Sequence, residues 1–396
     1  MISQSARRVI RANILGLLCL GILCGILVAG LWPFGHPRNQ VSWLENETGL
    51  RFGNHGTILS SGPFKMTSSQ DEASCSLEIW LQPGLTYDTN TILAFYAPSG
   101  PRQFSLHQYN ANLELQSDLR NQQHQTQTAK LYVDEVFRQG KTVFITVTSG
   151  TQETAVYING ALRRTSVGFP LLSGDFTGQL VVGDSPVGPD SWSGQLLGLA
   201  IYDQKLTAAQ VLQHYEAWTN NRWRDLAENE DNVARYFFDE HAGRVVYNHV
   251  GSGVDLYIPQ RYMIVNQRFL QPFWEEFRTD WSYWKNVLIN IGGFIPFGFF
   301  FCAYLSSVRN IQRPALATII LGGGLSLTIE VLQAYLPTRQ SGMTDVITNT
   351  LGTCVGITLF HFERTRAIYR TSPNLIPFAR FDDLHSRGRV AHSRDR

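Results

Sequence analysis

Residues 286–308 read NVLINIGGFIPFGFFFCAYLSSV, a run without a charged side chain. Residues 13–32 and 346–362 are likewise uncharged, and 314–338 carries a single charge, that of Glu330. Apolar segments of about 17 to 25 residues match the hydrocarbon thickness of a bilayer. The sequence therefore predicts four membrane-spanning helices, at about 13–32, 286–307, 314–336 and 345–362.

The remainder of the chain has a different composition. Over all 396 residues the charged fraction is 16% and the formal net charge is +1. Residues 33–285 are polar enough to form a domain in water with a core of its own. This segregation excludes a simple cytosolic enzyme, and it also excludes a protein that lies wholly within the membrane.

Basic residues lie next to alternate ends of the predicted spans. Residues 1–12 contain three arginines, the segment between the second and third spans contains Arg309 and Arg313, and residues 364–396 contain eight arginines against three aspartates. Cytoplasmic segments of membrane proteins carry such an excess of positive charge. We therefore expect a cell-membrane protein with both termini cytoplasmic and residues 33–285 external or periplasmic.

The basic tail and the first span each have a second interpretation. An arginine-rich segment such as 363–396 can bind nucleic acid, but beside a membrane span it is expected to lie against anionic lipid, so no nucleic-acid partner is predicted. Val28-Ala29-Gly30 could serve as a signal-peptidase site. An apolar run of about 18 residues is long for a signal peptide, and we expect a retained anchor.

Residues 41–220 show the pattern of short β-strands. Leu77, Ile79 and Leu81 alternate with Ser76, Glu78 and Trp80, as in a half-buried strand. The dipeptide 159–160 is Asn-Gly between two such runs, which favours a type I′ hairpin because both positions need a positive φ. Repeated short strands with turn residues between them predict an antiparallel β-sandwich of jelly-roll type.

One helix and one cysteine complete the expectations for this domain. Thr207 is expected to cap a helix, and the residues expected to share its buried face are Val211, Leu212, Tyr215 and Trp218. Of the five cysteines, only Cys75 lies outside the predicted spans. The domain therefore has no disulfide of its own and depends on its apolar core.

Five segments in order resemble concanavalin A-like domains of the laminin-G type. They are Ser76–Pro83, Val156–Gly160, Leu180–Gly183, Trp192–Gln195 and Ile201–Val211. The resemblance implies a two-sheet jelly roll that binds glycans or proteins, in some members through calcium. A further fragment, Tyr236–Gly243, resembles the opening strand of such a domain, so residues 221–285 are expected to add strands or to form a linker.

The residues needed for binding or catalysis in this domain give weaker signals. No segment has the alternating carboxylates with which glycosidases of this fold work, so an enzyme is not the favoured interpretation. Aromatic residues that could contact a glycan are Tyr87, Tyr96, Tyr109 and Trp192. Asp184 and Asp190 could supply oxygen ligands to calcium, but turn formation is the favoured explanation for both residues. No other cofactor is predicted.

The predicted spans carry polar side chains near their external ends. An ionisable group inside a span costs about 2.5 to 3.5 kcal/mol at mid-bilayer, so it usually faces a bundle interior. The helical spacing groups these side chains into three stripes: Asn286 with Asn290, Ser326 with Glu330 and Gln333, and Asp345 with Asn349. Arg339 lies in the loop between the third and fourth spans, where it could pair with Asp345 or Glu330. We expect either a structural staple or a site for a polar ligand.

The same segments resemble the VanZ-like membrane family. The matching motifs are Asn290–Gly298, Ser326–Gln333, Arg339, and Asp345–Gly352 with Gly356. The resemblance covers about 286–362 and implies that the sandwich is inserted after the first of four helices. VanZ-like proteins are linked to resistance against the glycopeptide teicoplanin, with no agreed mechanism. The resemblance thus implies a fold, a polar signature and a setting in the cell envelope.

Three hypotheses for function follow from these features. In the favoured one, the jelly roll binds an envelope glycan or a surface protein, and the polar site recognises an envelope glycan, a lipid-linked head group or a glycopeptide antibiotic. In the second, the protein is a membrane enzyme or transporter for lipid-linked intermediates, with Glu330 or Asp345 as base or proton carrier. In the third, it is a structural adhesin. The sequence leaves the oligomeric state open.

Overall fold

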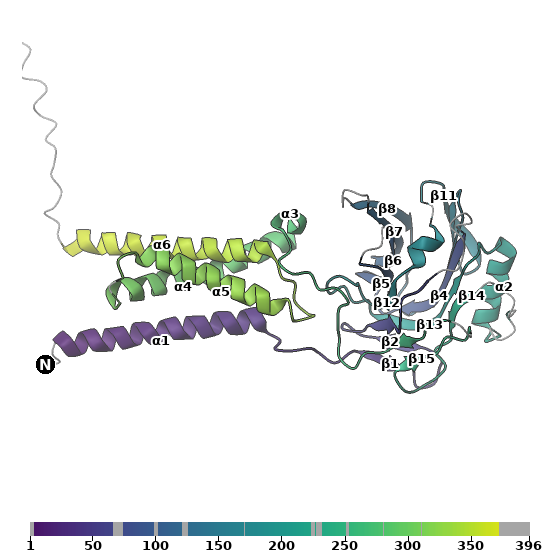
Figure 1. Cartoon of the computed structure of the whole chain (residues 1–396), viewed down its shortest axis with the longest axis horizontal. Coiled ribbons are helices and arrows are strands. Elements are labelled where there is room, and N and C mark those ends of the chain that lie inside the picture. The colour runs from purple at the N-terminus through teal and green to yellow at the C-terminus, as the bar shows by residue number, and fades with distance from the viewer. Residues whose placement is uncertain are drawn as a thin grey trace, which may run out of the picture. The chain divides into compact units, whose positions relative to one another are not determined.

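The chain forms two compact units in a computed structural model (Figure 1). Unit 1 comprises Met1–Gly30, Pro272–Glu330 and Gly342–Arg396, and unit 2 comprises Leu31–Gln271 and Val331–Ser341. The structure describes residues 4–65, 74–98, 102–120, 126–169, 171–222, 226, 232–250, 253–279, 281–309 and 311–371.

Unit 1 is helical. Its helices are α1 (Gln4–Leu31, whose last residue belongs to unit 2), α3 (Phe273–Glu276), α4 (Trp281–Ser307), α5 (Pro314–Gln333, whose last three residues belong to unit 2) and α6 (Met343–Thr371). Among the described residues, three segments are long and apolar enough to cross a membrane: Ala12–Leu31, Trp281–Ser307 and Pro314–Gln333. The predicted fourth span lies inside α6, which is richer in threonine and other polar residues.

Small residues let the backbones of the helices approach closely. A Cβ atom added to Gly352 of α6 would lie 2.2 Å from the carbonyl oxygen of Ile291 in α4, and one added to Gly298 of α4 would lie 2.1 Å from the carbonyl oxygen of Thr353 in α6. A Cβ atom added to Gly356 of α6 would lie 2.1 Å from the carbonyl oxygen of Ile295 in α4. These glycines therefore fix the packing of α4 on α6, as small residues do in membrane bundles.

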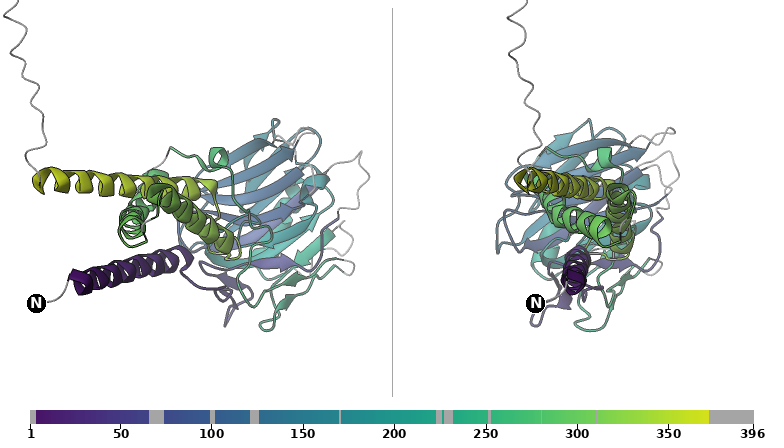
Figure 2. Two further views of the ribbon diagram at one scale, coloured as in Figure 1. Left: turned by 60° about the vertical axis from the view of Figure 1, so that its left-hand side comes forward. Right: turned by 90° about the vertical axis from the view of Figure 1, so that its left-hand side faces the viewer.

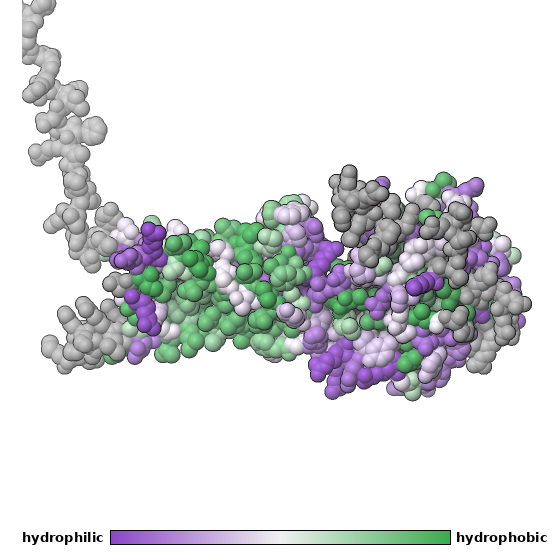
Figure 3. Space-filling view, in the orientation of Figure 1, coloured by the Kyte–Doolittle hydropathy of each residue, from purple (hydrophilic) through white to green (hydrophobic). Residues whose placement is uncertain are grey.

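Another side of α6 is apolar and exposed. Its exposed large apolar residues recur about every four positions: Met343, Ile347, Leu351, Val355, Leu359 and Phe362. The face of unit 1 that Figure 3 shows is also mostly apolar. An exposed stripe of this length is unusual for a protein in water and fits contact with lipid.

Unit 2 is a sandwich of two antiparallel sheets (Figure 2). The first sheet has the order β1 (Val41–Trp43), β2 (Leu50–Phe52), β13 (Gly194–Tyr202), β4 (Cys75–Pro83), β9 (Val143–Ser149), β10 (Thr154–Ile158) and β11 (Ala161–Ser166), and β14 (Asn232–Tyr236) also pairs with β13. The second has the order β15 (Val245–Val246), β16 (Leu256–Tyr257), β3 (Ile58–Ser60), β12 (Gln179–Val182), β5 (Thr89–Tyr96), β6 (Arg102–Tyr109), β7 (Asn112–Arg120) and β8 (Thr126–Val133).

The period-two pattern builds the core between the sheets. Leu77, Ile79 and Leu81 are fully buried in one core cluster. Asn159 and Gly160 have φ values of 52° and 78°, so the hairpin between β10 and β11 has the positive φ values that its turn needs. The predicted β-sandwich is confirmed. Strands β14, β15 and β16 come from residues 232–257 and extend both sheets, so the segment after residue 220 completes the sandwich.

Helix α2 (Ala208–Thr219) packs against the outer face of the first sheet. Thr207 caps it, and Gln210 completes a capping box. The prediction of its buried face was wrong at Leu212, which is 47% exposed, because His214 is buried instead. Nδ1 of His214 lies 3.0 Å from a carboxylate oxygen of Glu78. This polar pair determines which side of α2 faces the sheet.

Candidate functional site

Polar side chains from four helices of unit 1 meet near the N-terminus of α6. The amide of Asn290 in α4 donates to Oδ1 of Asp345 in α6 over 2.7 Å. The amide of Asn349, one turn further along α6, donates to the hydroxyl of Ser326 in α5 over 2.9 Å. We call these residues, with Glu330 and Glu276, the α6 N-terminal network.

Two carboxylates occupy the start of α6 itself. Oε2 of Glu330, which is 1% exposed, accepts a hydrogen bond of 2.8 Å from the backbone N–H of Gly342. A carboxylate oxygen of Glu276, in α3, accepts one of 2.9 Å from the N–H of Thr344. The first N–H groups of a helix have no partner within the helix, and its N-terminus attracts negative charge. The network therefore stabilises the start of α6.

The remaining residues of the predicted polar cluster are Asn286, Gln333 and Arg339. Asn286 is exposed in the first turns of α4. Gln333 and Arg339 belong to unit 2, where the guanidinium of Arg339 donates to the carbonyl oxygen of Trp32 through Nε over 3.0 Å. Gln267 donates to the carbonyl oxygens of Gln333 and Arg339 over 3.2 and 2.8 Å. In unit 2, Arg339 therefore orders the chain that follows α5.

Sequence reasoning missed Glu276. The residue lies in a four-residue helix, α3, which has no apolar periodicity that would mark it. Its neighbours Phe273, Trp274 and Phe277 are 48, 65 and 55% exposed. The only signal in the sequence is a carboxylate among exposed aromatic residues just before an apolar run, a pattern typical of the membrane interface.

The outer face of the second sheet in unit 2 is polar and carries an aromatic pair. The rings of Tyr109 in β6 and Tyr132 in β8 have centroids 6.0 Å apart and are 43 and 39% exposed. Between them the strand register places His107 opposite Glu114, and Glu114 opposite Tyr132. We call this surface, which also includes Ser105, Gln116, Asp118, Thr128 and Lys130, the polar face.

Hydrogen bonds hold the side chains of the polar face in fixed positions. Nζ of Lys130 lies 2.6 Å from Oε1 of Glu114, and this hydrogen bond raises the pKa of Lys130. The ring of His107 lies 2.8 Å from the Ser105 hydroxyl and 3.1 Å from that of Thr91. Burial lowers the pKa of His107, which favours its neutral form. The face thus presents donors, acceptors and one cation in a rigid array.

The four aromatic residues proposed for glycan contact divide into two pairs. Tyr87 and Tyr109 are 80 and 43% exposed and are accessible to a ligand. Tyr96 and Trp192 are 5 and 1% exposed. The indole N–H of Trp192 donates to Oε1 of Gln108 over 2.9 Å, so this residue belongs to the core.

Asp184 and Asp190 organise the loop between β12 and β13. Oδ1 of Asp184 accepts hydrogen bonds from the N–H groups of Ser185 and Asp190 over 2.8 and 2.9 Å, and Oδ2 accepts one from the Ser191 hydroxyl over 3.1 Å. Burial raises the pKa of both aspartates to about 6. These bonds are those of a turn-forming aspartate. Calcium binding by this pair stays a prediction.

Two further features of unit 2 were not predicted. A cleft of about 490 Å³ lies beside the loop between β1 and β2, and its lining residues are Ser42, Trp43, Leu44, Glu45, Asn46, Glu47, Arg51 and Gln195. The ligand atoms of Asp239, Glu240 and His249 lie within 4.8 Å of one another and could hold a metal ion. Neither feature has a fixed spacing in the sequence, because each joins segments that meet only in the fold.

Two family models match the chain. The VanZ/LLP1 model matches residues 254–368, and the model of the concanavalin A-like lectin/glucanases superfamily matches residues 54–212. No curated protein sequence matches the chain. Both family resemblances predicted from the sequence are confirmed.

Several solved structures are similar to the chain at low identity. One is a candidate carbohydrate binding protein from Bacteroides ovatus, at 14% identity and a TM-score of 0.36; the match covers 56% of this chain and 63% of that protein, less than two thirds of its length. Another is the SAP-like pentraxin of Limulus polyphemus, at 14% identity and a TM-score of 0.32, covering 55% of this chain and 93% of that one. A third is the CBM40 of Ruminococcus gnavus IT-sialidase, at 12% identity and a TM-score of 0.31. The match covers 42% of this chain and 96% of that one. By the family models alone, residues 54–212 are similar to the concanavalin A-like superfamily and residues 254–368 are similar to the VanZ/LLP1 family.

Proposed function

We propose that the protein is an envelope membrane protein that binds a glycan through the polar face of its sandwich. The observation that carries this proposal is the exposed Tyr109–Tyr132 pair beside a row of fixed donors and acceptors. Sugars present apolar C–H faces and hydroxyl groups together, so they need a flat aromatic surface with hydrogen-bonding groups next to it. The ordered side chains lower the entropy that binding would cost.

The membrane setting of this proposal has four spans. Three helices have the length and apolarity of spans, and α6 adds the exposed apolar stripe described above. Trp281 and Trp284 are 75 and 45% exposed in the first turn of α4, where the interface of a membrane favours tryptophan. With the arginine-rich ends in the cytoplasm, the sandwich lies outside the membrane and can reach envelope glycans.

Glycan binding is tested with the full chain in lipid nanodiscs on an array of envelope glycans, with envelope proteins as a second array. Tyr109→Ala combined with Tyr132→Ala should reduce binding of the array glycan that the unchanged chain binds at least tenfold. Tyr257→Ala is the matched control, because Tyr257 is 41% exposed on β16 and lies outside the polar face. Binding that the double variant retains, or binding to proteins alone, would contradict the proposal.

The α6 N-terminal network favours a second function, recognition of a polar head group at the membrane surface. Carboxylates and amides from α3, α4, α5 and α6 gather at one place in a unit whose exterior is apolar. Buried polar groups in a membrane protein are costly and commonly mark a functional site. A hydroxyl- or amine-bearing head group could exchange hydrogen bonds with Asp345 and Asn290.

This second function predicts that a change in the network weakens ligand binding without unfolding the protein. Asp345→Asn should fold normally and should weaken binding of labelled lipid-linked glycan to nanodiscs that hold the protein. Thr358→Val, on the same helix at an exposed position, is the control. If Asp345→Asn and Glu330→Gln both fold and bind lipid as the unchanged chain does, the network only joins the helices.

A further inference from the structure

We infer that Asp239, Glu240 and His249 of unit 2 bind one divalent transition-metal ion of the zinc type. Asp239 and Glu240 follow β14, and His249 follows β15. One ligand atom from each of the three side chains lies within 4.8 Å of the other two. Nε2 of His249 is 3.6 Å from Oδ1 of Asp239, a distance that leaves the two atoms able to share an ion.

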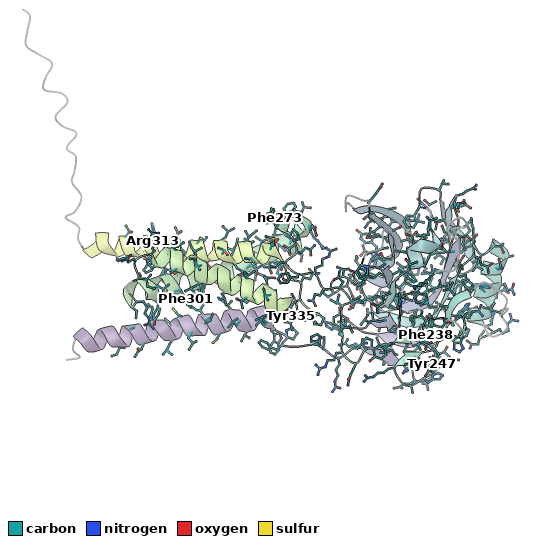
Figure 4. All side chains as sticks on the ribbon, viewed as in Figure 1. Phe238, Tyr247, Phe273, Phe301, Arg313 and Tyr335 are labelled. Carbon is teal, nitrogen blue, oxygen red and sulfur yellow. The ribbon has the colours of Figure 1, made fainter. Side chains whose placement is uncertain are left out.

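The backbone brings two adjacent carboxylates to the same place. Neighbouring side chains of a regular strand point to opposite faces of the sheet. Phe238 and His241, on either side of the Asp239-Glu240 pair, both have a φ of 53°. These left-handed residues end the alternation of β14, so both carboxylates reach the imidazole of His249. Phe238 and Tyr247, labelled in Figure 4, mark the two segments that supply the ligands.

The three side chains are held in position by their surroundings. Oε1 of Glu240 accepts a hydrogen bond of 2.7 Å from the backbone N–H of Tyr247. The N–H of His249 donates to the carbonyl oxygen of Arg235 over 3.0 Å, and its ring packs against that of Phe237 with centroids 4.7 Å apart. Contacts of this kind orient metal ligands before the ion arrives.

One carboxylate oxygen at the site has no hydrogen-bond partner among the described residues. Oε2 of Glu240 is buried and accepts no hydrogen bond from the described residues. A buried carboxylate oxygen without a partner is costly, and a cation beside it would remove this cost. This observation is independent of the spacing of the three ligands, and it points to a positively charged occupant.

The donor set indicates the class of ion. Calcium prefers oxygen ligands only, whereas an imidazole nitrogen with two carboxylates suits zinc and its first-row neighbours. The His249 side chain is 40% exposed, so an ion can enter from solvent and keep water in its remaining positions. The ion would tie the end of β14 to the turn after β15 and would thereby fasten the two strands that extend opposite sheets.

This segment also contacts the edge of the cleft in the sandwich. The N–H of Gly49 donates to the carbonyl oxygen of Phe238 over 2.9 Å, and the indole of Trp43 donates to that of Gly243 over 3.1 Å. Residues 238–243 therefore support the loop that lines the cleft. A bound ion would hold both the ligand segment and this loop in place.

The test uses the tag-free full chain in nanodiscs, stripped with a chelator and dialysed against zinc chloride. We expect one zinc ion per chain, a rise in the Tm of the sandwich, and a visible spectrum of nitrogen–oxygen coordination when cobalt replaces zinc. His249→Ala and Glu240→Gln should each weaken zinc binding at least tenfold. His36→Ala, which removes an exposed histidine outside the site, should leave it unchanged.

Three results would overturn the inference. They are a stripped wild-type chain that takes up no zinc, zinc uptake that His249→Ala and Glu240→Gln leave intact, and calcium that competes with zinc at equal concentration. Because the cobalt spectrum is measured on the unchanged chain, a variant that fails to fold does not leave the inference untested. Glycan binding does not enter any of these measurements, so they stand apart from the proposed function.

Discussion

The two units of this protein bury and expose polar and apolar side chains in opposite ways. Unit 2 buries leucine, isoleucine and phenylalanine between its sheets and places polar residues outside. Unit 1 exposes an apolar stripe along α6 and buries Ser326, Glu330 and Asn349. The same physical rule explains both, because each group is placed where its surroundings can satisfy it. The difference indicates that the two units have different solvents, water and lipid.

The close packing of glycines distinguishes unit 1 most strongly, and Gly352→Leu should have the largest effect. A side chain at Gly352 meets the backbone carbonyl of Ile291, which cannot rotate away. We expect a loss of about 3 kcal/mol in the stability of the bundle, the upper end of the usual cost of overpacking, measured by thermal unfolding in detergent. Gly324→Ala, at a position with open space, should be neutral; equal losses would refute the role of close packing.

Removal of a buried carboxylate should have the next largest effect. Glu330→Leu leaves the N–H of Gly342 without its acceptor at the start of α6. The expected cost is about 1 to 3 kcal/mol, seen as faster amide exchange in the first turns of α6. Glu330→Gln, which keeps an acceptor, should lose less. If the two variants exchange alike, the hydrogen bond does not stabilise the helix.

Acid should stabilise the loop between β12 and β13 of unit 2. Burial raises the pKa of Asp184 from 3.8 to about 6, so the folded chain binds the proton more tightly than the unfolded chain does. This contribution is complete below pH 3.8 and is lost as the pH rises through 6. From pH 7 to pH 5 the gain is about 1 kcal/mol, measurable by amide exchange in β12. Asp184→Asn should remove this part of the pH dependence, and an unchanged profile would contradict the assignment.

An exposed ion pair on the sandwich should have the smallest effect. Nζ of Lys205 lies 3.2 Å from Oε1 of Glu153, and the two side chains are 37 and 40% exposed. Such pairs contribute between about 0 and 1 kcal/mol in water. Lys205→Ala should therefore leave amide exchange in β9 and β10 almost unchanged. A loss as large as that of Glu330→Leu would remove the contrast between the two units.

The sequence predicts the helices and strands of both units better than it predicts which side chains form hydrogen bonds with one another. Apolar run length identifies α1, α4 and α5, and period two identifies strands such as β4, because each depends on local order alone. Helix spacing places Asn290, Ser326, Asp345 and Asn349 in stripes near the external ends of the predicted spans. It does not specify that Asn290 pairs with Asp345 and Asn349 with Ser326. Whether they form a ligand site stays a prediction.

The remaining features depend on contacts between distant segments. The burial of His214 in place of Leu212 follows from Glu78, which lies 136 residues away in the sequence. The metal site depends on left-handed φ values at Phe238 and His241, neither of which is a glycine that would mark the turn. Glu276 caps α6 from a segment 68 residues earlier. Local patterns carry no information about such pairs.

Thiol labelling in spheroplasts tests most directly whether unit 2 lies in water outside the membrane and unit 1 lies in lipid. In a background without the five native cysteines, Tyr257→Cys places a thiol on the sandwich and Arg309→Cys places one after α4. A membrane-impermeant maleimide should label position 257 in intact spheroplasts and position 309 only after permeabilisation. Labelling of position 309 in intact spheroplasts, or protection of position 257, would contradict a sandwich that lies outside the membrane.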